Sequence, residues 1–117
     1  MLKELLQYTS PLRHNDITQY EYLPTQLGSQ IKFINSENFD IEQTDLIILG
    51  CGEMRGQVRN GPYSNGPDLI RDQLYKLHFW HPDLIIGEIE NISEGATLND
   101  TRAALRTVLT ELQKKKK

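Results

Sequence analysis

The sequence is poor in cysteine and has no long apolar segment. Cys51 is the one cysteine among 117 residues, so no internal disulfide can form, and such sparse use of cysteine is typical of a reducing compartment. No apolar run approaches the roughly 18 residues that a membrane span requires. The N-terminus lacks the basic and then apolar pattern of a signal peptide. We therefore expect a cytoplasmic protein that has no membrane partner.

Positive charge is also scarce outside the C-terminus. Four of the 13 basic residues are the terminal lysines, so nine basic residues face 16 acidic ones in the rest of the chain, a net charge of −7. Binding to nucleic acid needs clustered Lys and Arg that neutralise phosphates. The acidic composition therefore argues against nucleic acid as a partner.

A chain of 117 residues forms one domain at most. Residues 1–26 are expected to form an irregular N-terminal arm, of the kind that packs across a sheet edge or against a neighbouring subunit. Residues 27–117 carry alternating strand and helix signals. The expected elements are a half-exposed strand within 28–34, buried strands at 45–49 and 84–89, a helix from 67 to about 80, and a helix from about 97 to the terminal lysines. Strands and helices that alternate in this way predict the α/β class, with parallel strands joined by right-handed crossovers.

The first helix has a predicted start, packing face and end. Pro67 suits the first helical position, where its missing N–H costs nothing. Ile70, Leu74 and Leu77 follow at the i, i+4, i+7 spacing of a stripe that packs on the sheet. Because the residue before a proline disfavours helix, the dipeptide at 81–82 predicts that the helix ends by about Trp80.

The second helix and the first buried strand are predicted in the same way. Thr97 and Asp100 have the spacing of a capping box. The helix that follows is expected to bury Ala104, Leu105, Val108, Leu109 and Leu112. The four consecutive apolar residues 46–49 are typical of a parallel strand that is covered on both faces.

A glycine-containing turn follows the first buried strand. Gly50-x-Gly52 resembles the start of a dinucleotide-binding fingerprint, but Arg55 stands where a third glycine is required, and the helix begins only near Pro67. The glycines are better explained as residues that let the chain turn off the strand. Cys51 has no partner histidine at the next strand end, so we expect a small buried residue rather than a nucleophile.

The loop after this strand holds the candidate site residues Arg55, Arg59 and Asn60. The loop leaves the carboxyl end of a strand, where open α/β sheets bind ligands. An arginine there could hold a carboxylate through two parallel hydrogen bonds. The alternatives are a solvated loop, or an arginine that pairs with Glu53 or with a neighbouring subunit. Inside a longer protein, the three residues would lie at the mouth of a substrate site.

Two further pairs of polar residues have a functional and a structural interpretation. His78 and His81 could lie on one side of a helical turn, but a metal site needs three or four ligands and none lies at a compatible spacing. A helix-end surface explains them better. Glu88 and Glu90 share one side of a strand end, and paired carboxylates can perform acid–base chemistry, but acidic residues that leave a sheet are more often solvated. The residues alone predict no catalytic residue and no metal ligand.

The most specific pattern in the chain is RNG at 59–61, followed by GPxxIRxxLYxL at 66–77. It resembles the first loop and first helix of the ureohydrolases, the family of arginase, agmatinase and formimidoylglutamase. LPTQLGSQI at 23–31 and LGCGEMRG at 49–56 look most like the formimidoylglutamase branch. Residues 88–90 occupy the place where family members commonly carry an aspartate and a glycine at the end of a strand. The resemblance extends from about Leu23 to Leu112.

The resemblance implies a three-layer α/β/α sandwich, of which this chain is the N-terminal part. It also implies hydrolysis of a formimino or guanidino C–N bond by a hydroxide that bridges two manganese ions. The metal ligands of the family come from a GGDH-type segment and later Asp and His clusters, which would lie beyond Lys117. No metal ligand is therefore carried over, and this chain alone is expected to be inert. Because a parallel pair of strands cannot bury both faces by itself, we expect a further strand.

Two hypotheses therefore stand. In the first, the chain is the N-terminal segment of a manganese-dependent ureohydrolase that acts on a small-molecule substrate, and it joins the remainder of its own chain or a homo-oligomer. In the second, it is a stand-alone, non-catalytic module that oligomerises through its sheet edge or docks on a partner. A nucleotide-binding half-domain is the third interpretation.

Overall fold

The computed structural model describes residues 7–10, 20–34, 39–56, 62–81 and 83–115. In chain order, its elements are β1 (Thr9–Ser10), the 3-10 turn η1 (Leu27–Ser29), β2 (Ile31–Phe33), the 3-10 turn η2 (Ile41–Gln43), β3 (Leu46–Gly50), α3 (Gly66–Leu74), β4 (Ile86–Ile92) and α4 (Leu98–Lys115). Two of the candidate site residues, Arg59 and Asn60, lie outside the described residues.

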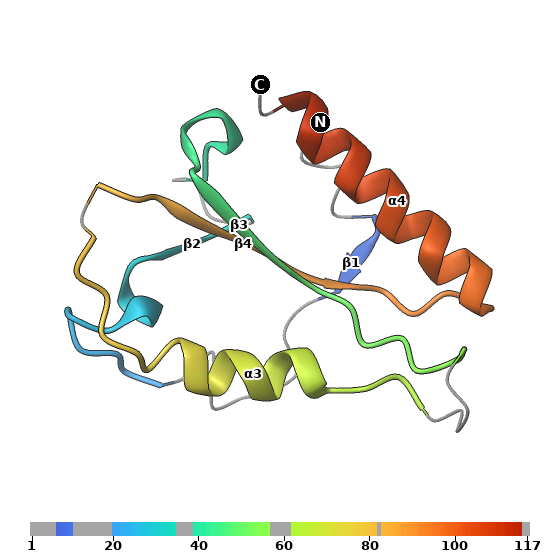
Figure 1. The fold of residues 1–117 in the computed structure, drawn as a ribbon, viewed down its shortest axis with the longest axis horizontal. Coiled ribbons are helices and arrows are strands. Elements are labelled where there is room, and N and C mark those ends of the chain that lie inside the picture. The colour runs from blue at the N-terminus through green and yellow to red at the C-terminus, as the bar shows by residue number, and fades with distance from the viewer. Residues whose placement is uncertain (1–6, 11–19, 35–38, 57–61, 82, 116–117) are drawn as a thin grey trace.

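β4 is the central strand of a four-stranded mixed sheet. β3 pairs with β4 in parallel along one edge, and β2 pairs with it in parallel along the other. Asn91 pairs with both Gly50 of β3 and Ser10 of β1, so the antiparallel β1 continues the edge that β2 occupies. α3 and α4 lie on opposite sides of the sheet (Figure 1). The predicted α/β class is confirmed, and the expected parallel pairing holds for β2, β3 and β4 but not for β1.

β3 is an edge strand within the part of the chain that the structure describes. There it pairs with β4 alone. Leu46 is 54% exposed, and the three apolar residues that follow are only half-buried. The prediction that both faces of this strand are covered is therefore wrong for the described residues. The apolar run instead leaves surface in contact with water beside an unpaired backbone edge.

A bulge in β4 changes which of its side chains share a face. The register advances by one residue on β3, from Ile48 to Leu49, but by two residues on β4, from Glu88 to Glu90. Glu90 has a φ of 79°, in the left-handed region that residues other than glycine rarely adopt. Across the extra residue, side chains that are three positions apart face the same way.

The bulge gives β4 one apolar and one polar face. Ile89 and Ile92 both lie in the core that faces α4, whereas Glu88 and Asn91 both form hydrogen bonds with α3. In an unbroken strand, residues separated by three positions point to opposite faces. The bulge therefore allows Ile89 and Ile92 to face α4 while Glu88 and Asn91 face α3.

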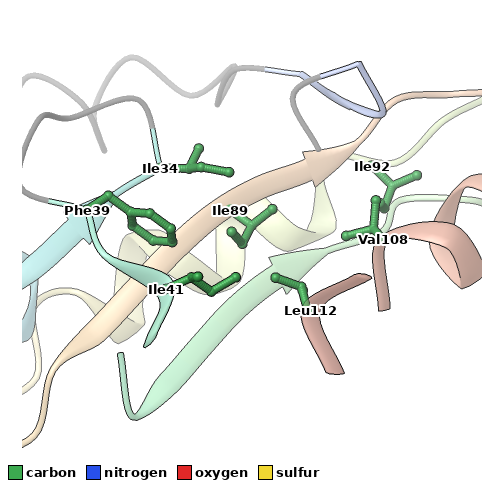
Figure 2. Close-up of a cluster of buried hydrophobic side chains, with 7 residues drawn as sticks. All are labelled: Ile34, Phe39, Ile41, Ile89, Ile92, Val108 and Leu112. Atoms are coloured by element: carbon green, nitrogen blue, oxygen red, sulfur yellow. The ribbon is translucent and has the colours of Figure 1, made fainter. Parts of the chain in front are cut away.

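The hydrophobic core lies between the sheet and α4 (Figure 2). It consists of the buried side chains of Ile34, Phe39, Ile41, Ile89, Ile92, Val108 and Leu112. Ala104 and Leu105 of α4 are partly buried against this cluster. Leu109 was predicted to be buried as well, but it lies at the margin of the helix face and is 44% exposed.

α4 begins at the predicted capping box. The Asp100 amide donates to Thr97 Oγ1, and the Thr97 amide donates to Asp100 Oδ2, both at 3.2 Å. These reciprocal bonds satisfy amide groups at a helix start that have no partner within the helix. The predicted start of this helix is confirmed.

α3 ends well before Trp80, the predicted end. The carbonyl groups of Tyr75 and Leu77 accept hydrogen bonds from the amides of Gly28 and Leu27, both at 2.8 Å. Those acceptors are therefore used by the segment that precedes β2. The helix therefore ends where the chain begins to pair with this distant segment.

The predicted apolar stripe of α3 is mostly exposed, and only Leu74 of its three residues is half-buried. Ile70 is 68% exposed and Leu77 is 58% exposed. The residues that the chain buries here are Asp68, Arg71 and Tyr75, which are 1%, 2% and 1% exposed. α3 therefore presents polar side chains to the polar face of β4.

The bulge leads to a prediction for Glu90. Glu90→Gly should be more stable than Glu90→Ala by about 1 kcal/mol, because both variants lose the carboxylate but only glycine adopts a positive φ without steric cost. Urea unfolding of the two variants measures this difference. Equal free energies of unfolding would contradict the left-handed conformation at this position.

Candidate functional site

A buried ion pair joins α3 to β4. Arg71 Nε donates to Glu88 Oε1 at 2.7 Å, and Arg71 Nη2 donates to Glu88 Oε2 at 2.9 Å. Arg71 is 2% exposed and Glu88 is not exposed at all. This bidentate geometry is the strongest that an arginine and a carboxylate can form. The pair fixes the helix on the central strand.

Asp68, Asn91 and Glu90 extend this network. Arg71 Nη1 donates to Asp68 Oδ1 at 3.1 Å and to Asn91 Oδ1, and Nη2 donates to the Glu90 carbonyl at 3.1 Å. Asn91 Nδ2 donates to Asp68 Oδ1 at 2.7 Å. The amide of Glu90 donates to Glu88 Oε2 at 2.8 Å. The polar groups are thus partners for one another, as buried polar groups require.

Burial and neighbouring charges set the protonation of the network. The Tyr75 hydroxyl donates to Glu88 Oε1, and burial, followed by the Glu88 charge, raises the pKa of Tyr75 far above its ordinary value. Burial is the largest single influence on Arg71 and opposes its charge, but the hydrogen bonds to Glu88 together with the charges of Glu88, Tyr75 and Asp68 outweigh it and raise the pKa of Arg71. Burial and then the charge of Glu88 raise the pKa of Glu90. Tyr75 therefore stays protonated and Arg71 stays charged.

The network holds elements together rather than offering a reactive group. Arg71 and Glu88 have almost no contact with solvent, and their donors and acceptors are already used. The expectation that Glu88 is solvated is wrong, because Arg71 and Tyr75 both bind it inside the protein. Asp68, Arg71 and Tyr75 share one helix face at the i, i+3, i+7 spacing. This spacing is the signal in the sequence that could have predicted the buried face of α3.

Arg55 forms a second clamp, nearer the surface. Its Nε and Nη2 donate to the two carboxylate oxygens of Glu53 at 2.9 and 2.7 Å. Its Nη1 and Nη2 also donate to the carbonyl groups of Ala96 and Gly95 at 2.9 and 2.8 Å. Arg55 therefore ties the loop after β3 to the loop before α4. Its role at a substrate mouth stays a prediction.

A pocket of about 300 Å³ lies beside this clamp, between the loop after β3 and the first turns of α4. It is found at the carboxyl end of a strand, where α/β sheets bind ligands. Cys51 lines the pocket and is exposed. The prediction of a buried cysteine is therefore wrong, because the chain leaves the sheet at Gly50 and carries the next residue to the surface.

The glycines on either side of Cys51 are explained by close packing. A β-carbon at Gly50 would overlap the side chain of Asn91, and one at Gly52 would overlap the carbonyl of Ser64. Neither glycine has a positive φ. Space, rather than the sharp turn that the sequence suggested, requires glycine at these two positions.

The two candidate histidines lie after α3 and not on it. His78 pairs with Gln26 in an isolated antiparallel bridge, and the His81 ring lies 4.1 Å from the Trp80 ring between centroids. Among the residues that the structure describes, no three His, Cys, Asp or Glu side chains gather in a way that could hold a metal ion. No helix in the same part of the chain has the length and hydropathy needed to cross a membrane.

Comparisons of the chain with protein-family models, with curated proteins and with solved structures find no match.

The buried ion pair leads to a prediction for Arg71. Arg71→Met should lower the free energy of unfolding by about 3–5 kcal/mol, because Glu88 and Asp68 stay buried without a cation. Lys76→Met is the matched control: Lys76 forms a partly exposed i,i+4 pair with Asp72 at 3.5 Å, and its loss should cost about 1 kcal/mol or less. Urea unfolding measures both.

A double variant separates the ion pair from general packing. Adding Glu88→Gln to Arg71→Met removes one of the two unpaired carboxylates, so part of the lost stability should return. If Arg71→Met cost no more than Lys76→Met, the pair would not be the main link between α3 and β4.

The Arg55 clamp predicts a dependence of stability on pH. Hydrogen bonding from Arg55 lowers the pKa of Glu53 from 4.5 to about 2. Because the folded value lies below the unfolded one, the clamp stabilises the fold above pH 4.5, and this stabilisation is lost as the pH falls towards 2. The difference in Tm between the wild type and Glu53→Gln should therefore be full near neutral pH and should shrink below 4.5. A difference that stays constant with pH would contradict the clamp.

Proposed function

We propose that this chain is the N-terminal segment of a manganese-dependent ureohydrolase-like enzyme, most similar to the formimidoylglutamase branch. The complete enzyme would have an arginase-like α/β/α fold and would hydrolyse a formimino or guanidino C–N bond. In this proposal the segment supplies strands and loops at the edge of the active site and is inert alone. The enzyme would be cytoplasmic and would form a homo-oligomer.

The observation that carries the proposal is the left-handed conformation of Glu90. The resemblance places residues 88–90 where ureohydrolases commonly have an aspartate and a glycine. Glycine adopts a positive φ without steric cost, and Glu90 has a φ of 79°. The backbone therefore has the shape that a glycine would favour, in a segment where the family has one, and an acidic residue lies in the same segment at Glu88.

The helix motif adds support. Within residues 66–77, Gly66-Pro67 opens α3, and Arg71 and Tyr75 are the residues that bind Glu88. The polar positions of the motif thus have a physical role, which is to attach the helix to the next strand. The two segments that resemble the family, the helix motif and the strand end, are therefore in direct contact through Arg71, Tyr75 and Glu88.

The open side of the sheet is consistent with a larger domain. Leu46 of β3 and Leu69 and Ile70 of α3 are 54%, 50% and 68% exposed, and a pocket of about 270 Å³ lies between the two elements. A further strand paired with β3 would satisfy its backbone edge and remove apolar surface from water. In the proposed enzyme, another part of the ureohydrolase fold occupies this side.

The manganese ions of the proposed enzyme have no ligand set in the described part of this chain. Manganese is bound mainly by oxygen ligands such as carboxylates, and no three His, Cys, Asp or Glu side chains gather there in a way that could hold a metal ion. Glu88 and Asp68 share the cation of Arg71 instead. These residues do not fit the metal, so we assign them no catalytic step, and the proposal places the metal site elsewhere in the enzyme.

The alternative is a stand-alone interaction module, and the same apolar surface favours it. Leu69, Ile70, Leu77 and Trp80 are 50–68% exposed on or just after α3. A module that oligomerises through this side would be folded and monodisperse without metal. A segment of an enzyme would be unstable or aggregated when it is produced alone.

Intact mass spectrometry of the natural polypeptide, followed by an activity assay, tests the proposal. We expect a polypeptide of about 35–45 kDa that releases formamide or urea from formimino or guanidino substrates, with an activity that a chelator removes and manganese restores. A natural polypeptide of 13.5 kDa that forms a monodisperse oligomer would overturn the proposal in favour of the module. A larger polypeptide that is inactive on both substrate classes with manganese would refute the reaction.

A further inference from the structure

The pocket beside the Arg55 clamp contains a second guanidinium, that of Arg102. Arg102 lies on α4, lines the pocket and is exposed. A β-carbon at Gly56 would lie 3.9 Å from Arg102 Nη2, so the guanidinium reaches across the pocket to the loop after β3. Within the described part of the chain, Arg102 makes no hydrogen bond and no ion pair.

The remaining charges of the pocket favour a ligand with a single negative charge. Both carboxylate oxygens of Glu53 are bound by Arg55, so Glu53 does not compete for Arg102. Hydrogen bonding to Glu53, with the nearby charges of Glu94 and Asp100, raises the pKa of Arg55, so Arg55 is already neutralised by acidic neighbours and Arg102 is the cation that the pocket offers to a ligand. One carboxylate matches this one guanidinium, whereas the second charge of a dianion such as phosphate would have no partner among the residues that line the pocket.

The walls of the pocket add an apolar component. Leu98 and Leu105 are half-buried residues of α4 that line the same space. A volume of about 300 Å³ is at the small end of the range for ligand pockets. A guanidinium beside a leucine wall recognises a small molecule that has one carboxylate and an apolar body.

We propose that this pocket binds a small monocarboxylate, whose carboxylate pairs with Arg102 and whose apolar part lies against Leu98 and Leu105. The site lies at the carboxyl end of β3, where side chains from a loop and a helix converge. This site is defined by the pocket and its charges alone and does not depend on the ureohydrolase assignment.

Cys51 provides a reporter inside the pocket. It is exposed, lines the pocket and is the one cysteine of the chain. Iodoacetate and iodoacetamide alkylate a thiolate in the same way: a sulfur–carbon bond forms, the carbon–iodine bond breaks, and iodide leaves with the electron pair. Iodoacetate carries a carboxylate and iodoacetamide is neutral. Because Arg102 attracts carboxylates, it should raise the rate at which iodoacetate alkylates Cys51 more than the rate for iodoacetamide.

The experiment measures both alkylation rates at Cys51 in the full natural polypeptide, by mass spectrometry of the peptide that contains this residue. Arg102→Gln should lower the ratio of the iodoacetate rate to the iodoacetamide rate by about threefold or more, the effect of losing one partly screened ion pair. Arg106→Gln is the matched control, because Arg106 is an exposed arginine one turn further along α4. It should leave the ratio unchanged.

A protection assay identifies the ligand class. Isovalerate should slow the modification of Cys51 by iodoacetamide in a saturable way, whereas its neutral counterpart isovaleramide should not. The proposal is overturned if Arg102→Gln and Arg106→Gln give the same ratio, if isovaleramide protects equally well, or if inorganic phosphate protects better than isovalerate. Circular dichroism verifies that both variants keep the fold. Loss of the proposed hydrolase activity would not affect this assay, so the two proposals fail independently.

Discussion

The pairing of Arg71 with Glu88 is the interaction on which the arrangement of the elements depends. Removing two ions from water costs several kcal/mol for each ion, and only a bidentate geometry with further hydrogen bonds offsets this cost. Tyr75 and Asn91 supply those additional bonds. Because the ions belong to α3 and β4, both are satisfied only when the helix lies on one face of the central strand. The network therefore specifies a single position for α3, which an apolar contact would fix less sharply.

The two helices attach to β4 by different physical means, and the functional proposals follow from this difference. α4 packs against the apolar face of the sheet, and the hydrophobic core lies between them (Figure 2). α3 is held by its polar face, so its apolar residues Leu69 and Ile70 remain exposed next to the open edge of β3. The carboxyl end of β3 is closed by the Arg55 clamp, which leaves a small pocket beside it. The exposed apolar side of α3 and β3 thus favours association with further protein surface, and the pocket at the carboxyl end of β3 favours a small ligand.

Residue patterns were sufficient to predict the longer strands and helices and the α/β class. The capping box of Thr97 and Asp100, the proline at the start of α3 and the apolar run of β3 were all readable, because each signal depends on residues a few positions apart. The order of strands and helices then implied an α/β fold. The glycine-rich loop and Arg55 were correctly located at a strand end, and the pairing of Arg55 with Glu53 was one of the interpretations that the sequence left open.

Which faces of α3 and β4 are buried depends on the tertiary structure. Glu88 is buried because Arg71 reaches it from a helix 17 positions earlier, and the apolar stripe of α3 is exposed for the same reason. The left-handed Glu90 arises from the pairing of β4 with β3, and it turns polar and apolar residues to opposite faces. Arg102 of α4 reaches across the pocket to Gly56 in the loop after β3. Each of these outcomes depends on a partner that is distant along the chain, and a pattern of local spacing does not identify that partner.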